Sequence, residues 1–521
     1  MIPPPASPPA FSPEAITACA RRIREYVHVV ADPAGRELGL VAGARPAGPV
    51  VGTLPPLYPE WLGGRTFCEA HGVRFPYVAG EMAGGIATTR MVAEMARAEM
   101  LGFFGAAGLG ADRVEREVAT LTDTLAGRSN WGVNLIHSPA EPALEHRVAT
   151  LLVRRAVPCV SASAYMELTP SVVLCAARGL RRGGDGRVTR RTRLLAKVSR
   201  PEVAARFLSP APPALLRDLV GRGELDPSEA ELAARVPVAE DVTVEADSGG
   251  HTDNRPLAAL LPRVRSVRDE LTRRFGYPRP PRIGAAGGLG TPAAVAAAFA
   301  LGAAYVVTGS VNQTAVEAGL SDPAKAMLAE ADVADVAMAP AADMFEWGVT
   351  LQVLRRGTMF APRAGRLLAA YQEYPSLDAL PGPVRAKLET EVLGASIGEV
   401  WERTQAFWRD RDPAQLDRAE RDPKHRMALV FRWYLGSSSR WAVSGEPSRR
   451  GDYQIWCGPA MGAFNRWSEG SFLARPENRT VVQIALNLLE GAAVVTRAHQ
   501  LRTCGVPVPD AAFVHVPRRL A

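Results

Sequence analysis

The sequence Arg282-Ile-Gly-Ala-Ala-Gly-Gly-Leu-Gly-Thr-Pro292 holds a strand, a loop and the start of a helix in immediate succession. Arg282–Ala286 is a short apolar run, which indicates a buried strand. The glycines that follow allow a ligand or another backbone to approach closely. Thr291 can cap a helix with its hydroxyl, and Pro292 suits a first helical turn. This stretch therefore predicts one strand–loop–helix unit with a glycine-rich loop.

The same unit recurs along the chain on both sides of this stretch. The predicted strands are Pro76–Met82, Phe103–Ala107, Trp131–Ile136, Cys159–Ala162, Leu194–Val198, Val242–Ala246, Arg282–Ala286 and Tyr305–Thr308. The predicted helices between them are residues 90–101, 112–126, 141–155, 170–180, 201–207, 256–274 and 291–301. Strand–helix alternation implies parallel strands with covering helices. Eight repeats favour an α/β fold of the closed (β/α)8 (TIM) barrel type, and a doubly wound open sheet is the alternative.

The remaining sequence suggests two flanking regions around the barrel. We expect residues 1–60 to form an arm and connector, residues 61–320 the barrel, and residues 321–521 a mainly helical region with a C-terminal helix. Residues 479–499 have the pattern of a long amphipathic helix, which is either the eighth helix of the barrel or a homodimer contact. The loop 452–465 either closes the helical region on the barrel or contacts substrate.

The charge, cysteine spacing and hydropathy of the sequence argue against several classes of protein. The net charge of +7 is spread along the chain without a basic stripe carrying aromatics, so we expect no nucleic acid partner. The six cysteines form no CxxC pair, which argues against a zinc site, any other metal centre built on cysteine, and a disulfide framework. No signal peptide and no apolar run long enough to cross a bilayer are evident, so we expect a cytoplasmic protein without a membrane partner.

A barrel of this type carries its chemistry on the loops that follow the strands. Small and polar residues are concentrated at these positions, including Asn134, Lys197 and the sequence Gly249-Gly-His251. Histidine changes its protonation most readily near neutral pH, which makes His251 a candidate catalytic residue, although a loop histidine without a chemical role is the alternative.

The loops after the seventh and eighth predicted strands suit a phosphate. Gly287-Gly288 precedes a helix start, and Gly309-Ser310 forms a second turn of small residues. Barrels often bind phosphate with these two loops through backbone N–H groups and a helix N-terminus. The pattern differs from the dinucleotide GxGxxG, which falls inside a βαβ unit.

Several long stretches resemble one flavoprotein superfamily. They are Gly80–Ala87, Trp131–His137, Val160–Ala164, Glu245–Asn254, Gly284–Thr291 and Thr308–Thr314. These are similar to the nitronate monooxygenase (2-nitropropane dioxygenase-like) superfamily. The chain more narrowly resembles the PfaD-type trans-acting enoyl reductases of polyunsaturated fatty acid and polyketide synthases. That match continues through residues 339–346, 431–436 and 452–465 and covers nearly the whole chain from about residue 50.

The resemblance implies a non-covalent FMN in the barrel mouth, reduced by NADPH. It further implies hydride transfer to the β-carbon of an α,β-unsaturated thioester carried by an acyl carrier protein. The residues implied at the cofactor are Met82, Ala83 and Gly84 along the ring, Asn134 at the pyrimidine, Lys197 at the N1–C2=O end, Gly249 and Gly250 beside the phosphate-bearing chain, and Gly287, Gly288, Gly309 and Ser310 at the phosphate. His251 is implied beside the flavin, either as the proton donor to the α-carbon or as a hydrogen-bond donor to the thioester carbonyl.

Two alternatives come from other classes of function. One is a nitronate monooxygenase-type flavin oxidase, which the large region after residue 320 disfavours. The other is a non-catalytic docking subunit of a synthase, which the intact candidate flavin loops disfavour. An acyltransferase is disfavoured because the chain has no GxSxG elbow.

Overall fold

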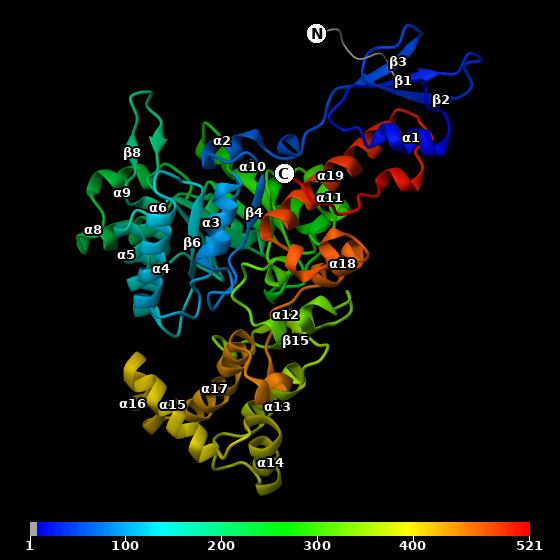
Figure 1. Cartoon of the computed structure of the whole chain (residues 1–521). Coiled ribbons are helices and arrows are strands. Elements are labelled where there is room, and N and C mark those ends of the chain that lie inside the picture. Colours follow the sequence, from blue (N-terminus) through cyan, green and yellow to red (C-terminus); the bar gives the residue numbers. More distant parts are fainter. Residues whose placement is uncertain (1–7) are drawn as a thin grey trace.

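A computed structural model describes residues 8–521, and its centre is a closed barrel of parallel strands (Figure 1). The strands follow the order β10-β11-β13-β14-β4-β5-β6-β7. Their bounds are β4 Tyr77–Ala79, β5 Leu101–Phe104, β6 Trp131–Ile136, β7 Cys159–Ser163, β10 Arg193–Val198, β11 Asp241–Glu245, β13 Arg282–Ala286 and β14 Val306–Thr308. The (β/α)8 barrel prediction is thus confirmed, and the doubly wound alternative is wrong because β14 pairs with β4 and closes the sheet.

The predicted helices cover the outside of this barrel. They are α3 Thr89–Arg97, α4 Ala111–Thr124, α5 Pro142–Arg154, α6 Pro170–Ala177, α7 Pro201–Leu208, α10 Leu257–Phe275 and α11 Pro292–Ala300. Thr291 caps α11 as expected, since its hydroxyl accepts from the Ala294 N–H at 3.3 Å. The structure adds α2 Arg65–His71, α8 Pro213–Gly221, α9 Pro227–Ala233 and the hairpin of β8 Arg181–Arg182 with β9 Val188–Thr189.

The eighth helix of the barrel comes late in the chain. Helix α19, Val481–Thr503, packs against α11 on one side and α3 on the other, so it fills the gap between the seventh and first units. Gly491 permits this approach, because a Cβ there would lie 2.5 Å from the Cγ of Pro292. Of the two roles considered for this segment, the structure supports the eighth helix.

Helix α19 also corrects the expectation about apolar runs. By length and hydropathy it could cross a membrane, contrary to that expectation. However, 78% of its apolar window is buried inside the protein, as in the core helix of a globular domain.

The N-terminal region is folded rather than a simple arm and connector. Strands β1 Val27–Ala31, β2 Leu38–Ala42 and β3 Val50–Leu54 form an antiparallel sheet in the order β2-β1-β3. Helix α1, Pro13–Ala20, and the end of α19 supply its apolar core, which includes Ile16 and Leu501. The expectation of an arm and connector did not include this sheet. Several of the prolines and glycines that suggested it, such as Gly35, Pro46 and Pro49, lie between the strands, whereas Gly39 and Gly52 lie inside β2 and β3. Residues 1–7 lie outside the described part.

The inserted domain comprises residues 321–480, between β14 and α19. Its helices are α12 Asp322–Ala329, α13 Phe360–Glu373, α14 Gly382–Lys387, α15 Ile397–Arg411, α16 Ala414–Arg421, α17 Pro423–Ser444 and α18 Ala460–Ser468. It also contains β15 Val336–Pro340 and β16 Thr350–Leu354, which the expectation of a mainly helical region did not include. These strands form a sheet in the order β12-β16-β15, and β12 is the barrel segment Gly250–His251.

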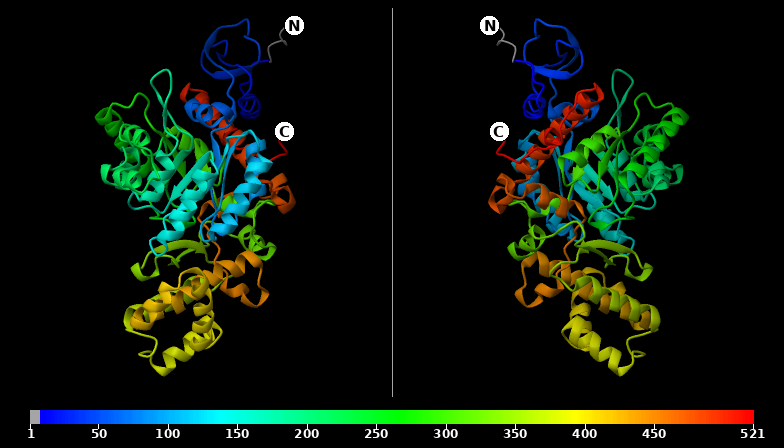
Figure 2. Two further views of the ribbon diagram at one scale, coloured as in Figure 1. Left: turned by 90° about the vertical axis from the view of Figure 1, so that its left-hand side faces the viewer. Right: turned by 90° about the vertical axis from the view of Figure 1, so that its right-hand side faces the viewer.

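Short helices complete the described chain. They are the 3-10 helices η1 Pro59–Trp61, η2 Ser310–Thr314, η3 Phe345–Trp347, η5 Pro447–Asp452, η6 Phe472–Ala474, η7 Pro476–Asn478 and η8 Asp510–Phe513, and the π-helix η4 Leu388–Leu393. Figure 2 shows the inserted helices beyond one end of the barrel and the N-terminal sheet beyond the other.

A buried ion cluster closes the amino-terminal end of the barrel. Asp241 accepts two hydrogen bonds from Arg282, at 2.6 and 2.7 Å, and lies 3.0 Å from Nε2 of His71 on α2. The side chains of His71 and Asp241 are fully buried. Burial opposes the charged imidazole, but attraction to Asp241 and the hydrogen bond outweigh it and raise the pKa of His71 to about 9.

Candidate active site

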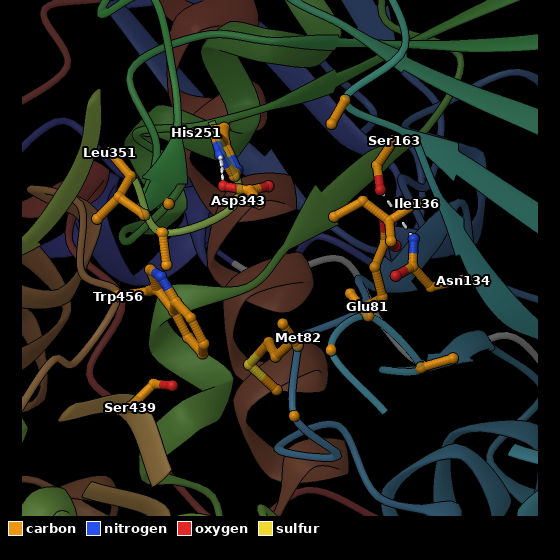
Figure 3. A pocket seen from close by; sticks show the side chains of 18 of the residues that line it. Glu81, Met82, Asn134, Ile136, Ser163, His251, Asp343, Leu351, Ser439 and Trp456 are labelled. Atoms are coloured by element: carbon orange, nitrogen blue, oxygen red, sulfur yellow. Dashed lines mark hydrogen bonds and ion pairs between the residues drawn. The ribbon is translucent and has the colours of Figure 1, made fainter. Parts of the chain in front are cut away.

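A cavity of about 740 Å³ lies between the carboxyl ends of the barrel strands and the inserted domain. Every site residue predicted from the sequence lines it: Met82, Ala83, Gly84, Asn134, Lys197, Gly249, Gly250, His251, Gly287, Gly288, Gly309 and Ser310. Figure 3 shows how Glu81, Asn134, His251 and Trp456 are arranged around this space. The barrel thus brings together residues that are far apart in the chain.

His251 is paired with a carboxylate from the inserted domain. Its Nε2 lies 3.1 Å from Oδ1 of Asp343, in the segment between β15 and β16, and the two side chains are 30% and 39% exposed (Figure 3). Burial favours the neutral ring, but Asp343 by its charge and hydrogen bond, and then Glu245, outweigh this effect and raise the pKa of His251. Strand β12, which carries His251, pairs with β16, and Asp343 lies in the segment that leads into β16.

Lys197 lies between two carboxylates. Its Nζ is 3.0 Å from Glu245 and 3.4 Å from Glu81, and its side chain is 16% exposed. Burial alone would favour the neutral amine, but the two carboxylates raise the pKa of Lys197. The family resemblance implies that Lys197 helps to neutralise negative charge on the cofactor. In the structure, its ammonium group already forms ion pairs with Glu245 and Glu81.

Asn134 presents an acceptor to the cavity. Its Nδ2 donates to the carbonyl oxygen of Ser161 at 3.2 Å and to Oγ of Ser163 at 2.8 Å. Both amide hydrogens are therefore used on neighbouring strand β7, which leaves Oδ1 to accept from a ligand N–H.

The glycine-rich loops after β13 and β14 face the start of helix α18. Ser310 Oγ accepts from the Gly458 N–H at 3.2 Å, and Ala460 at the first turn of α18 lines the same cavity. A Cβ at Gly288 or Gly309 would meet nothing within 4 Å, so open space adjoins both residues. Backbone N–H groups, a serine hydroxyl and an uncapped helix start are the donors that hold a phosphate in many barrels.

Two other predicted glycines are required by packing rather than by a ligand. A Cβ at Gly249 would lie 2.8 Å from the backbone nitrogen of Cys457, and one at Gly287 would lie 2.8 Å from the backbone of Ala246. These glycines let loop 452–465 and the strand ends approach each other. Cys457 of this loop packs against the barrel, which supports the closing role considered for it. Trp456 lines the cavity, and substrate contact by the loop stays a prediction.

Helices α15 and α17 form the opposite wall of the cavity. Phe407, Trp408, Leu429 and Trp433 give this wall an aromatic and apolar character. Arg411 of α15 joins it to the barrel through an ion pair with Glu141, whose second oxygen lies 3.0 Å from Nη2.

Sequence reasoning missed several residues of this site. Asp343, Glu81 and the arginines of α15 and α17 carried no assigned role. Glu245 could have been predicted beside Lys197. Thr243 pairs with Lys197 on the adjacent strand, and Glu245 lies two residues further on, so its side chain points to the same face of the sheet as that of Thr243. Asp343 had no such signal, since it belongs to a different domain.

Comparisons with known proteins agree with this geometry. Residues 374–453 match the family model "[Acyl-carrier-protein] S-malonyltransferase, inserted helical domain". The chain is 45% identical over 466 residues to a polyunsaturated fatty acid synthase polypeptide of Thraustochytrium sp., a match that covers 88% of this chain and 31% of that protein. It is 43% identical over 436 residues to the polyketide biosynthesis protein PksE of Bacillus subtilis, covering 84% of this chain and 56% of that protein. The chain thus spans about a third and about half of the length of these two relatives.

A solved structure matches over its full length. The enoyl reductase domain of MlnA, from the macrolactin biosynthesis cluster of Bacillus amyloliquefaciens, is 36% identical, with a TM-score of 0.81. The match covers 85% of this chain and 99% of that domain. The chain therefore belongs to the PfaD-type trans-acting enoyl reductase family.

Proposed function

We propose that this protein is an FMN-dependent enoyl reductase that uses NADPH to reduce an α,β-unsaturated acyl thioester on an acyl carrier protein. The observation that carries the proposal is one cavity containing both a phosphate-type cradle and a histidine paired with the carboxylate of Asp343. Membership of the family supports the same reaction class. The carrier would belong to a polyketide or polyunsaturated fatty acid synthase, as the names of the relatives suggest.

The residues present fit a flavin mononucleotide. Gly288, Gly309 and Ser310, with the start of α18, would hold its phosphate. Asn134 Oδ1 would accept from the N–H of the pyrimidine ring, and the strand-end residues Met82 to Gly84 would lie along the ring system. When bound, FMN would supply the hydride chemistry between NADPH and the β-carbon of the substrate.

His251 would act on the thioester end of the substrate. Nε2 is engaged by Asp343, so Nδ1 is the ring nitrogen available to a ligand. A charged imidazole donates from this nitrogen, either to the thioester carbonyl as negative charge develops or to the α-carbon as a proton. Asp343 would favour the protonated ring, because it raises the pKa of His251, and would fix the orientation of the ring.

An anaerobic assay would test the proposal. Purified protein should show flavin absorbance and should oxidise NADPH in the presence of crotonyl-4′-phosphopantetheine. Protein without flavin would favour the alternative of a docking protein. Flavoprotein that oxidises nitroalkanes in air but reduces no enoyl thioester would favour the oxidase alternative.

A variant of His251 separates a chemical role from a structural one. His251→Ala should retain flavin and accept electrons from NADPH at the wild-type rate. Its re-oxidation by the enoyl thioester should be about 100-fold slower or more, which is the usual contribution of a general acid. Loss of flavin from this variant would show that the histidine is structural.

A further inference from the structure

One arginine of the cavity lacks a carboxylate partner. Besides His251, the cavity is lined by one lysine and four arginines: Arg113, Lys197, Arg411, Arg432 and Arg440. Four of them have a carboxylate within 4.0 Å, at Glu117, Glu245, Glu141 and Glu346 respectively. Among residues 8–521, no carboxylate lies within that distance of Arg440. Its guanidinium therefore forms no ion pair with these residues, and its side chain is still partly open to solvent.

The neighbours of Arg440 hold its guanidinium in place and add a second positive charge beside it. Its Nη2 donates to Oγ of Ser437 at 3.0 Å, and its guanidinium lies 5.8 Å from the centre of the Phe407 ring. Arg411 lies 5.4 Å from the same ring. Partial burial and then the positive charge of Arg411 lower the pKa of Arg440, yet a guanidinium stays charged at neutral pH. Two guanidiniums on one aromatic ring create a positive region, and among the described residues Glu141 is the only carboxylate within 4.0 Å of either guanidinium.

This region lies across the cavity from the phosphate cradle of the flavin site. Arg411 is tied to Glu141, which precedes α5 in the loop after β6. In the closed strand order, β6 is four strands away from β13, whose loop carries Gly287 and Gly288. Four of eight steps is half a turn of the barrel, so the Arg440 region and the cradle occupy opposite sides of the mouth. One bound phosphate cannot serve both.

We propose that Arg440 binds a phosphate ester of a ligand that enters the cavity beside α15 and α17. The proposal rests on the proposed function, which supplies two ligands with this chemistry. One is the phosphodiester that links the pantetheine arm to the carrier protein, and the other is the 2′-phosphate of NADPH. A guanidinium recognises either through paired N–H donors, and the Phe407 ring and Ser437 hold the guanidinium in place.

Direct binding to the FMN-loaded protein tests the proposal. Isothermal titration would compare 4′-phosphopantetheine with pantetheine, and NADP⁺ with NAD⁺, which differ in the same 2′-phosphate but cannot reduce the flavin, for the wild type, Arg440→Gln and Arg440→Lys. Arg403→Gln is the matched control, because Arg403 is also stacked on an aromatic ring, at 5.7 Å from Trp433, but does not line the cavity.

The expected result is a loss specific to one pair of probes. In Arg440→Gln, the Kd of either 4′-phosphopantetheine or NADP⁺ should rise about tenfold, while the matching phosphate-free probe binds as before. The pair that responds identifies the source of the phosphate. Arg440→Lys should recover part of the affinity, and Arg403→Gln should match the wild type.

The proposal is overturned if phosphate-bearing probes bind Arg440→Gln as tightly as the wild type. It is also overturned if the wild type does not discriminate between the members of either pair. Because binding is measured without turnover, a protein that binds phosphate through Arg440 but reduces no enoyl thioester would refute the proposed function alone.

Discussion

Replacing Asp343 by asparagine isolates the electrostatic part of the His251 pair. The amide keeps the shape of the side chain and removes its charge. Asp343 lies 3.1 Å from His251 and raises the pKa of the ring, so Asp343→Asn should lower that pKa. A reaction that needs the protonated ring loses rate as the pH rises through this pKa. The basic limb of the pH profile should therefore move to lower pH.

The magnitude follows from the distance and the exposure. Two unit charges about 4 Å apart interact by about 1 kcal/mol in water and about 4 kcal/mol near a protein surface. The side chains of His251 and Asp343 are 30% and 39% exposed, so solvent screening places the pair near the lower value. About 1.4 kcal/mol corresponds to a shift of about one pKa unit.

The assay is kcat/KM for enoyl reduction as a function of pH. Below both pKa values, Asp343→Asn should retain activity close to the wild type, and above them it should be about tenfold slower. Glu346→Gln is the control, because Glu346 lies three residues away but pairs with Arg432. A basic limb at the same pH in Asp343→Asn and the wild type would refute the assigned role.

Three further perturbations test other parts of the molecule. Lys197→Met should cost about 3 kcal/mol and lower the thermal midpoint, because two carboxylates would remain without their buried cation; an unchanged midpoint would contradict the ion network. Because the pKa of His71 is raised to about 9 from 6.5, its contribution to stability is full below about pH 6.5 and is lost as the pH rises through 9. Between these pH values the free energy of unfolding, measured with urea, should fall by roughly 3 kcal/mol less in His71→Gln than in the wild type. The same fall in both proteins would show that the His71–Asp241 pair does not cause the pH dependence of stability. Gly290→Ala should lose flavin on gel filtration, because its Cβ would lie 2.0 Å from the carbonyl oxygen of Ala460 at the start of α18; Gly110→Ala, where a Cβ meets nothing within 4 Å, should retain flavin absorbance.

The barrel could be predicted from the sequence because its signals are local. Each strand is a short apolar run, and a strand such as Trp131–Ile136 matches its predicted bounds. The glycine-rich loop and the Thr291 cap also follow from neighbouring residues. Since carboxyl ends of parallel strands meet at one end of a barrel, the residues of the cavity could be gathered without knowing any distance.

The features that were missed depend on contacts between distant segments. Strand β12 holds only Gly250 and His251, and it exists because β16 pairs with it about a hundred residues later. Asp343, which lies in the segment between β15 and β16, is likewise far from His251 in the sequence. The N-terminal strands are five residues each and separated by turns, so proline and glycine content suggested a connector instead. Arg440 became informative only when the partners of every other cavity cation were known.

The late position of α19 constrains how the molecule can be made. All eight barrel strands leave the ribosome before residue 309, but the wall between α11 and α3 is supplied only after the inserted domain has been synthesised. Until then the apolar faces of α11 and α3 have no cover, and a nascent barrel with an open seam is prone to aggregate. We expect the inserted domain to fold before α19 covers α11 and α3. Closure of the barrel wall and completion of the cavity would then occur together, at a late stage of synthesis.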